Sequence, residues 1–218
     1  MARSSGRTAP VPRRRAPARR RNEVNTARRE AILAAALDEF SASGFAAARL
    51  DDVARRAGVA KGTIYLYFRD KETLFQELVR SVISPLVARF ETTVEIDLPA
   101  RVVAERIVEL FVREVYGTRR KDVIRLIITE GPRFPKLAEF YYREVISRVI
   151  AAVRGLLHRA AARGEVGAEA LACFPQLLVA PGLVAIIWSG LFDRFEPLDV
   201  EALMRAHLDL LFGERRAP

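Results

Sequence analysis

Apolar residues recur three or four positions apart along most of this 218-residue chain. That spacing places side chains on one face of an α-helix. Ile32, Ala36 and Phe40 follow it near the N-terminus, and Leu74 and Leu78 follow it further on. No run of residues alternates between apolar and polar for long enough to indicate a β-strand. The sequence therefore predicts an all-α fold.

Proline and glycine mark where the predicted helices end. We expect helices over about 25–41, 51–57, 61–67, from 71 onward, and over 100–116, 121–130, 135–163, 168–192 and 199–212. Asp70 can cap the helix that begins at Lys71, because its side-chain oxygen can accept a hydrogen bond from a first-turn backbone N–H. Pro85 is expected to bend or end that helix.

Nearly all of the chain's formal net charge of +9 lies in its first 22 residues. This segment holds eight arginines and no acidic residue, together with several prolines. It has too little apolar surface to fold by itself, so we expect residues 1–24 to form a disordered basic arm. Contact with nucleic-acid phosphates would suit such an arm. A solvated tail without a role and a mitochondrial targeting segment are the alternatives.

Residues 171–192 contain no charged side chain in 22 positions. A helix of that length and composition can cross a bilayer. Pro175 and the Pro181-Gly182 pair interrupt it, however, and no cluster of lysine or arginine flanks it to set an orientation. The competing interpretation is a helix buried inside a bundle or a subunit interface. We keep as the alternative a membrane-associated or structural helical protein that uses residues 171–192 as an apolar anchor.

The chain carries few residues for covalent or metal chemistry. Its single cysteine, Cys173, excludes an intrachain disulfide and a cysteine-based zinc site, and its apolar neighbours predict a buried thiol. His158 and His207 are far apart in sequence and fit no metal-ligand spacing, so we expect both at solvent-facing helix positions. No nucleophile–base pair, paired carboxylates or phosphate-binding loop is visible. We therefore predict no enzyme activity, no metal and no cofactor.

The stretch AKGTIYLYF, residues 60–68, is poorly suited to a helix although its neighbours are good helix formers. Gly62 alone disfavours a helix by about 1 kcal/mol. Two short predicted helices meet at Ala57-Gly58-Val59, which is the arrangement of a helix-turn-helix. Ile64 and Phe68, four positions apart, are expected to point into the core. The remaining side chains of the stretch then face solvent.

The solvent-facing side of this stretch suits a DNA groove. Hydroxyls such as that of Tyr65 can donate to phosphate oxygens, Lys61 can reach a guanine edge or a phosphate, and Gly62 lets the backbone approach closely. Lys71 opens the next helix, where free backbone N–H groups favour a phosphate. The residues expected to face DNA are Lys61, Gly62, Thr63, Tyr65, Tyr67 and Lys71.

The block over residues 28–75 resembles the N-terminal domain of the TetR family of transcriptional regulators. The resemblance rests on Gly44-Phe45, Ala57-Gly58-Val59, Lys61-Gly62-Thr63-Ile64-Tyr65 and Phe68, with Lys71 and Leu74. It implies that five of the six residues above contact operator DNA, while Gly62 permits the close approach. The family often has Ser or Thr where this chain has Arg49, and Ser where it has Ala60, so two helix caps of about 1 kcal/mol each are lost. Arg49 can compensate with a phosphate contact.

The resemblance further implies a cytoplasmic, ligand-responsive repressor. It would have a helix-turn-helix domain over 25–72 and an effector-binding and dimerisation domain over 73–218. As a homodimer it would bind a palindromic double-stranded operator, with its two recognition helices about 34–36 Å apart. A small, largely apolar effector would release it from that operator. Residues 171–192 would then lie inside the helical bundle and the dimer interface.

Aromatic side chains in the middle of the chain are the candidates for an effector site. They are Phe90, Phe111, Phe134, Tyr141 and Trp188. Aromatic residues line pockets in helical bundles, but they also fill ordinary cores, so both roles remain open here. An anionic effector would be favoured if Arg125 or Arg133 faced the site.

Overall fold

The computed structural model of the protein describes residues 16–165, 171 and 173–213, with side chains from residue 22 onward. Every regular element in this part of the chain is helical, which confirms the all-α prediction. The α-helices are α1 (Ala16–Ala47), α2 (Leu50–Arg56), α3 (Lys61–Tyr67), α4 (Lys71–Val82), α5 (Ser84–Val94), α6 (Ala100–Phe111), α7 (Arg120–Glu130), α8 (Pro135–Tyr141), α9 (Ser147–Ala162), α11 (Gln176–Leu191) and α12 (Val200–Phe212). Two short π-helical segments are η1 (Val112–Tyr116) and η2 (Tyr142–Ile146).

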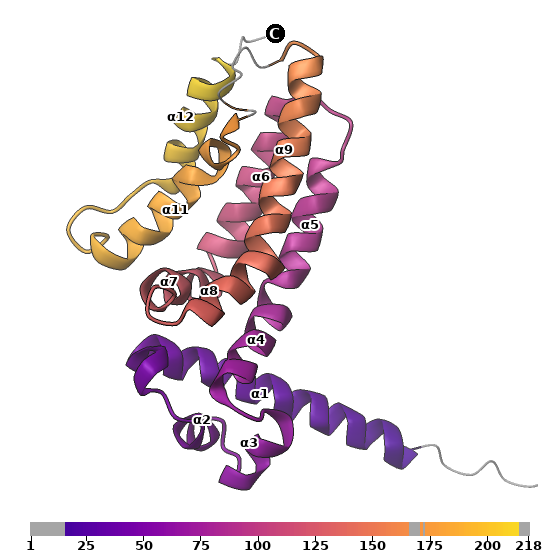
Figure 1. Cartoon of the computed structure of the whole chain (residues 1–218), viewed down its shortest axis with the longest axis vertical. Coiled ribbons are helices and arrows are strands. Elements are labelled where there is room, and N and C mark those ends of the chain that lie inside the picture. Colours follow the sequence, from indigo (N-terminus) through magenta and orange to yellow (C-terminus); the bar gives the residue numbers. More distant parts are fainter. Residues whose placement is uncertain (1–15, 166–170, 172, 214–218) are drawn as a thin grey trace, which may run out of the picture.

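Figure 1 shows an elongated molecule whose two ends are joined by α4. Helices α1, α2 and α3 lie together at one end. Helices α5, α6 and α9 run side by side toward the other end, with α11 and α12 along one flank. Helices α7 and α8 lie between the two ends and contact α1 and α4. The helix-turn-helix is therefore presented at one tip of the molecule.

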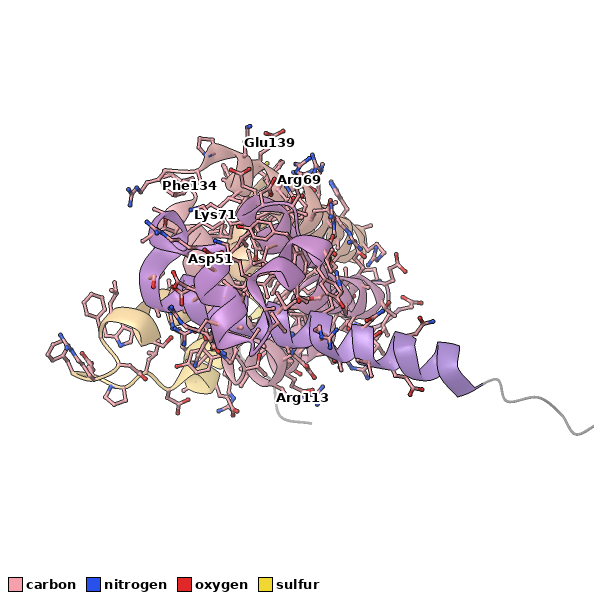
Figure 2. The ribbon with its side chains drawn as sticks, turned by 90° about the horizontal axis from the view of Figure 1, so that it is seen from below. Asp51, Arg69, Lys71, Arg113, Phe134 and Glu139 are labelled. Carbon is pink, nitrogen blue, oxygen red and sulfur yellow. The ribbon has the colours of Figure 1, made fainter. Side chains whose placement is uncertain are left out.

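Helix α1 begins nine residues before its predicted start at Asn25. It starts at Ala16, so the last part of the predicted arm 1–24 continues the helix, while residues 1–15 lie outside the described part of the chain. Pro17 is tolerated in a first turn because that turn has no partner for a backbone N–H. Side chains 22–28 are all exposed, and this half of α1 projects beyond the rest of the molecule (Figures 1 and 2). Without a buried face it has no apolar periodicity, so the sequence pattern missed it.

Three aromatic rings form the centre of the helix-turn-helix core. The ring centroids of Phe40 and Phe45 are 5.3 Å apart, and those of Phe45 and Phe75 are 6.0 Å apart. Ile64 of α3 and Phe68, the residue directly after α3, are buried against this core, as their spacing predicted. The sequence of α3 is a poor helix former, so tertiary packing of these two side chains holds it in place.

The same core continues into the rest of the molecule. Phe134, in the turn after α7, packs edge-on against Phe45 with ring centroids 4.9 Å apart. Leu126 of α7 and Leu137 of α8 are buried in the same cluster. The predicted boundary at residue 72 therefore divides the chain in sequence, while the packing across it is continuous.

The predicted break at Pro85 is confirmed. Helix α4 ends at Val82, and α5 begins at Ser84 with Pro85 in its first turn. A proline in a first turn loses no helical hydrogen bond, so the chain bends here at little cost.

Helix α11 contains a proline in its interior, Pro181. Proline has no N–H for the carbonyl four residues earlier, which is that of Leu177. His207 of α12 replaces this donor, because its Nε2 lies 2.7 Å from the Leu177 carbonyl oxygen. His207 is thus half-buried and bonded to α11 rather than solvent-facing as expected, whereas His158 is exposed.

The prediction of a buried thiol at Cys173 is wrong, because this residue is exposed and so is the neighbouring Phe174. The predicted helix over 168–192 is realised as α11 from Gln176, and residues 166–170 and 172 lie outside the described part. Among the described residues no helix is both long and apolar enough to cross a membrane. The 16-residue length of α11 accounts for this finding in the segment that raised the question.

Candidate DNA-binding interface

Helices α2 and α3 are joined by a tight turn with the predicted glycine. Gly58 has a φ of +67°, which L side chains rarely adopt. The backbone N–H of Val59 then donates to the carbonyl of Ala54 at 3.0 Å. Ala54 is buried, and its small side chain lets α2 and α3 cross closely. The turn thus fixes the direction in which α3 leaves α2.

The outer face of α3 carries most of the residues expected to contact DNA. Lys61, Gly62 and Tyr65 are exposed, with Tyr65 at 50% of its full accessible surface. A Cβ built on Gly62 would meet nothing within 4 Å, so the backbone is open to solvent there. Thr63 and Tyr67 are half-buried. This face is polar and aromatic, and its backbone is accessible at one point.

Lys61 is paired with an acidic residue of the preceding helix. Its Nζ donates to Oδ2 of Asp51 at 2.6 Å, and this hydrogen bond raises the pKa of the lysine. Asp51 lies in the first turn of α2, so the ion pair connects the beginnings of α2 and α3. Asp51 was not among the residues predicted from sequence, because nothing local to α3 indicates a partner ten residues away.

Lys71 is held inside the molecule more firmly than its predicted role suggests. Its Nζ donates to the carbonyls of Phe45 at 2.7 Å and of Ala46 at 2.8 Å. The same ammonium lies 4.8 Å from the centroid of the Phe45 ring. Lys71 therefore supplies donors for carbonyls at the end of α1, where the helix leaves them without intrahelical partners. Figure 2 views this end of the molecule, with Lys71 and Asp51 labelled.

The helix caps of this region follow the sequence analysis. Asp70 accepts a hydrogen bond from the backbone N–H of Thr73 at 2.7 Å, which lowers the pKa of the carboxyl and confirms the predicted cap of α4. Arg49 and Ala60 occupy the caps of α2 and α3 without any side-chain cap. Both absent caps were expected. Arg49 is exposed, so its guanidinium is accessible beside α2.

The projecting half of α1 passes close to α3. The hydroxyl of Tyr67 donates to Oδ1 of Asn25 at 3.4 Å. Arg29 pairs with Glu77 of α4 and lies 6.0 Å from the centroid of the Phe68 ring. These contacts hold α1 and α3 together on the same side of the molecule.

Leu66 was expected to face solvent, but it was not among the residues predicted to contact DNA. Its exposed fraction is 83%, the largest of the apolar residues on α3. Ile64 and Phe68 define the buried side of the helix, and Leu66 lies halfway between them in sequence and therefore on the opposite side. Its position in the sequence could have identified it as a candidate for DNA contact, since an apolar residue on that side of α3 has no packing role within the chain.

The five aromatic residues predicted to line an effector site lie in separate places. Phe134 and Tyr141 belong to the core shared with α1, where burial raises the pKa of the Tyr141 phenol. Phe90 is buried among α5, α6 and α9, and the ring of Phe111 packs against Gly182 of α11. The Trp188 indole N–H donates to the carbonyl of Glu196 at 2.7 Å.

The arginine considered as a partner for an anionic effector has its own contacts. Nη2 of Arg125 donates to Oγ of Ser189 at 3.0 Å, and its Nη1 donates to Asp122 at 3.1 Å. It thereby connects α7 to α11. Arg133, the other candidate, is exposed.

Comparison with known proteins gives the family. The model of the bacterial regulatory proteins of the tetR family matches residues 32–78, and a tetracyclin repressor-like C-terminal domain matches residues 104–211. The HTH-type transcriptional repressor BepR of Brucella suis is 32% identical over an alignment of 153 residues, and the match covers 65% of this chain and 69% of BepR. The chain belongs to the TetR family. It is thus a transcriptional regulator of the DNA-binding class.

Other relatives match over part of the chain or in fold. The HTH-type transcriptional regulator RutR of Escherichia coli is 35% identical over 88 residues, which are 40% of this chain and 42% of RutR. The match therefore spans less than half of that relative. The structure of FadR from Bacillus subtilis in complex with stearoyl-CoA has a TM-score of 0.68 at 21% identity, covering 85% of this chain and 99% of FadR. This likeness shows that the fold extends over both ends of the molecule.

Proposed function

We propose that this TetR-family regulator is a cytoplasmic repressor that binds a near-palindromic operator as a homodimer. A small, largely apolar effector releases it. The observation that carries the proposal is the outer face of α3, where Tyr65 and Leu66 are exposed while Ile64 and Phe68 anchor the helix from behind. An exposed phenol and an exposed leucine on a helix at the tip of the molecule have no role in the stability of the chain itself.

The contacts with DNA follow from the chemistry of this face. Lys61 reaches a guanine edge, Tyr65 and Thr63 donate hydroxyls to phosphates, and Gly62 admits the phosphate backbone closely. Arg49 adds a phosphate contact from the start of α2. Tyr67 contributes from beside Asn25. Lys71 supports the DNA-facing surface indirectly, because it holds the end of α1 in place. It also presents its remaining N–H to a phosphate.

The homodimer is supported by the apolar surface of α11. Leu183, Val184, Ile187 and Leu191 are each at least 40% exposed, and all four lie on this one helix. A second copy of the chain would cover them. A two-fold axis there would place two α3 helices in successive major grooves, about 34–36 Å apart.

Release by an effector is supported by the continuous core between the two ends. Phe134 and Leu137, next to α7 and α8, pack in the same cluster as Phe45 of α1. A ligand that favours one arrangement of the bundle would therefore shift α1 and, with it, α3. FadR of Bacillus subtilis holds stearoyl-CoA, and a ligand with an apolar portion suits the apolar composition of this bundle. The five predicted aromatic residues, Phe90, Phe111, Phe134, Tyr141 and Trp188, remain our candidates for contacts with such a ligand.

An electrophoretic mobility-shift assay tests the proposal. The probe is DNA from upstream of the chain's own gene, carrying any near-palindrome found there, and the comparison is a scrambled duplex of the same length. We expect a shift at low salt that survives competition by the scrambled duplex. The absence of any preferential shift, at low salt and with the full chain, would remove the basis for an operator-binding repressor.

A further inference from the structure

Lys61, the first residue of α3, is paired with a carboxylate in the chain without DNA. Nζ of Lys61 lies 2.6 Å from Oδ2 of Asp51, and both side chains are accessible to solvent. The second oxygen of the carboxylate, Oδ1, is buried and has no hydrogen-bond partner in the described part of the chain. One carboxylate oxygen of Asp51 is thus turned inward, and the other accepts the hydrogen bond from Lys61.

A carboxylate at this position is unfavourable for contact with DNA in general. Duplex DNA carries closely spaced phosphates, and most non-specific affinity comes from cations that pair with them. Lys61 can pair with a phosphate only by leaving Asp51, and Asp51 is then an unpaired anion next to a polyanion. On a duplex without the right base, the exchange of one anion for another brings Lys61 little gain.

The balance differs where Lys61 finds a guanine. The O6 and N7 acceptors of guanine make a base-specific contact with a lysine in the major groove. That contact forms only when the rest of α3 is seated, so its gain adds to those of the other side chains. We propose that Asp51 is a specificity-determining residue, whose carboxylate withholds Lys61 from phosphates and lowers affinity for non-operator DNA more than for the operator. This inference rests on the proposed function as a DNA-binding repressor.

The chain supplies a matched control one residue away. Asp52 also lies in the first turn of α2, so it experiences the same helix dipole as Asp51. Its partner is Arg55 of the same helix, at 2.6 Å, and not a residue of α3. Asp51→Asn and Asp52→Asn change the net charge equally and leave side chains of nearly equal shape. A difference between them isolates the contact with Lys61.

The experiment measures the binding of each full-length variant to two duplexes by fluorescence anisotropy. One duplex is the sequence that the wild-type chain selects from a random pool, and the other is its scrambled version. We expect Asp51→Asn to raise affinity for the scrambled duplex about 5-fold and for the selected duplex less than about 2-fold, so that the specificity ratio falls. We expect Asp52→Asn to raise both affinities by a similar factor, about 2-fold, and to leave the ratio unchanged.

Two further variants, Lys61→Gln and Lys61→Gln combined with Asp51→Asn, test the role of the lysine in the ion pair. Lys61→Gln should weaken binding to the selected duplex about 10-fold while changing the affinity and the salt slope on scrambled DNA little. In the Lys61→Gln background, the effect of Asp51→Asn on scrambled DNA should shrink to that of Asp52→Asn. Thermal unfolding of each variant establishes that the comparison is made between folded chains.

Three results would overturn the proposal. The specificity ratio could be the same in Asp51→Asn and Asp52→Asn, the effect of Asp51→Asn could persist without Lys61, or Asp51→Asn could weaken binding to the selected duplex. The last result would make Asp51 a direct contact or a support for Lys61. In all three cases the wild-type chain still prefers the selected duplex, so the proposed function stands. If the random pool yields no preferred duplex, the proposed function fails together with this inference.

Discussion

Two surfaces of this molecule expose side chains to solvent, and they differ in the kind of side chain that they present. The outer face of α3 carries Lys61 paired with Asp51, and Tyr67 bonded to Asn25. The exposed face of α11 carries Leu183, Ile187 and their apolar neighbours without any charge. On binding DNA as proposed, the first face would exchange its existing polar partners for new ones, whereas the second would be stabilised by burial of its apolar side chains. A surface of the first kind suits reversible, salt-dependent binding, and one of the second kind suits a lasting contact.

The largest expected effect comes from placing a charge on the apolar face of α11. Ile187→Asp should dissociate the proposed homodimer, because a carboxylate without a partner would be buried in its interface, and that is strongly unfavourable. Loss of the second binding module should weaken operator binding about 10²- to 10⁴-fold. Sedimentation velocity gives the mass, and anisotropy gives the affinity. His158→Asp, at an exposed position on α9, is the control and should change neither quantity. A variant that remains dimeric would place the interface elsewhere.

The next effect separates the two sides of α3. Ile64→Ala removes a fully buried side chain and should lower the free energy of unfolding by about 2–5 kcal/mol. Leu66→Ala, two residues on, should change it by less than about 0.5 kcal/mol, because Leu66 is exposed. Urea denaturation measures both. On the operator, Leu66→Ala should still lose about 3-fold in affinity if its methyl groups meet a thymine methyl in the groove. Equal stability losses in the two variants would contradict the orientation of α3.

Lys71 tests whether a basic residue near α3 works through DNA or through the fold. Lys71→Met keeps the stem over Phe45 but removes the donors to two carbonyls. We expect the free energy of unfolding to fall by about 1.5–3 kcal/mol, the range for hydrogen bonds from a charged group. Urea denaturation gives this value, and the salt slope of operator binding reports how many phosphates the protein neutralises. Unchanged stability with a reduced slope would assign Lys71 to phosphate binding alone.

Glu39 predicts a pH dependence for the attachment of α1 to α2. It is buried, accepts a hydrogen bond from Ser43 at 2.8 Å and pairs with Arg56 at 3.0 Å. The Ser43 hydrogen bond, supported by Arg56, lowers the pKa of Glu39 below its ordinary value of 4.5. The carboxylate thus stabilises the fold above that value, and the contribution is lost as the pH falls through the lower folded-state pKa. Glu39→Gln should flatten this loss by about 1 kcal/mol between neutral pH and pH 3 or so, measured by urea denaturation at each pH. An identical pH profile in the variant would rule the contribution out.

The last comparison concerns a single hydroxyl on the surface that we predict to face DNA. Tyr65→Phe should leave the free energy of unfolding unchanged, since the phenol is half exposed. It should weaken operator binding about 5-fold, which corresponds to one hydrogen bond of about 1 kcal/mol. Tyr142→Phe, another exposed phenol but on the body of the molecule, serves as the control. If both variants bind equally well to the operator, the Tyr65 hydroxyl makes no contact with phosphate.

Sequence alone could predict what depends on neighbours along the chain. Ile64 and Phe68 are four positions apart, Gly58 stands where a turn needs a positive φ, and Asp70 precedes a helix that it caps. Each of these follows from local geometry or periodicity, and each is confirmed. The resemblance in residues 28–75 then added the family.

The rest depends on residues that meet only in the folded chain. Lys71 bonds to carbonyls that are 25 and 26 residues away in sequence, and Lys61 bonds to a carboxylate on another helix. Cys173 was placed in the core because its neighbours are apolar, but an apolar segment can also carry an exposed face. The roles of the predicted DNA-facing residues remain predictions until they are measured with DNA.

The edge-on contact between the rings of Phe45 and Phe134 also bears on how relatives of this protein could be recombined. A chimaera joined at residue 72 would combine the helix-turn-helix domain of one regulator with the C-terminal domain of another. Phe45 would then face the turn of the other protein in place of the turn that carries Phe134. Such a hybrid should assemble poorly unless α7 and α8 are transplanted along with the helix-turn-helix domain. For chimaeras of this architecture, the parts to be exchanged are therefore defined by packing in three dimensions, and α7 and α8 belong with the helix-turn-helix domain.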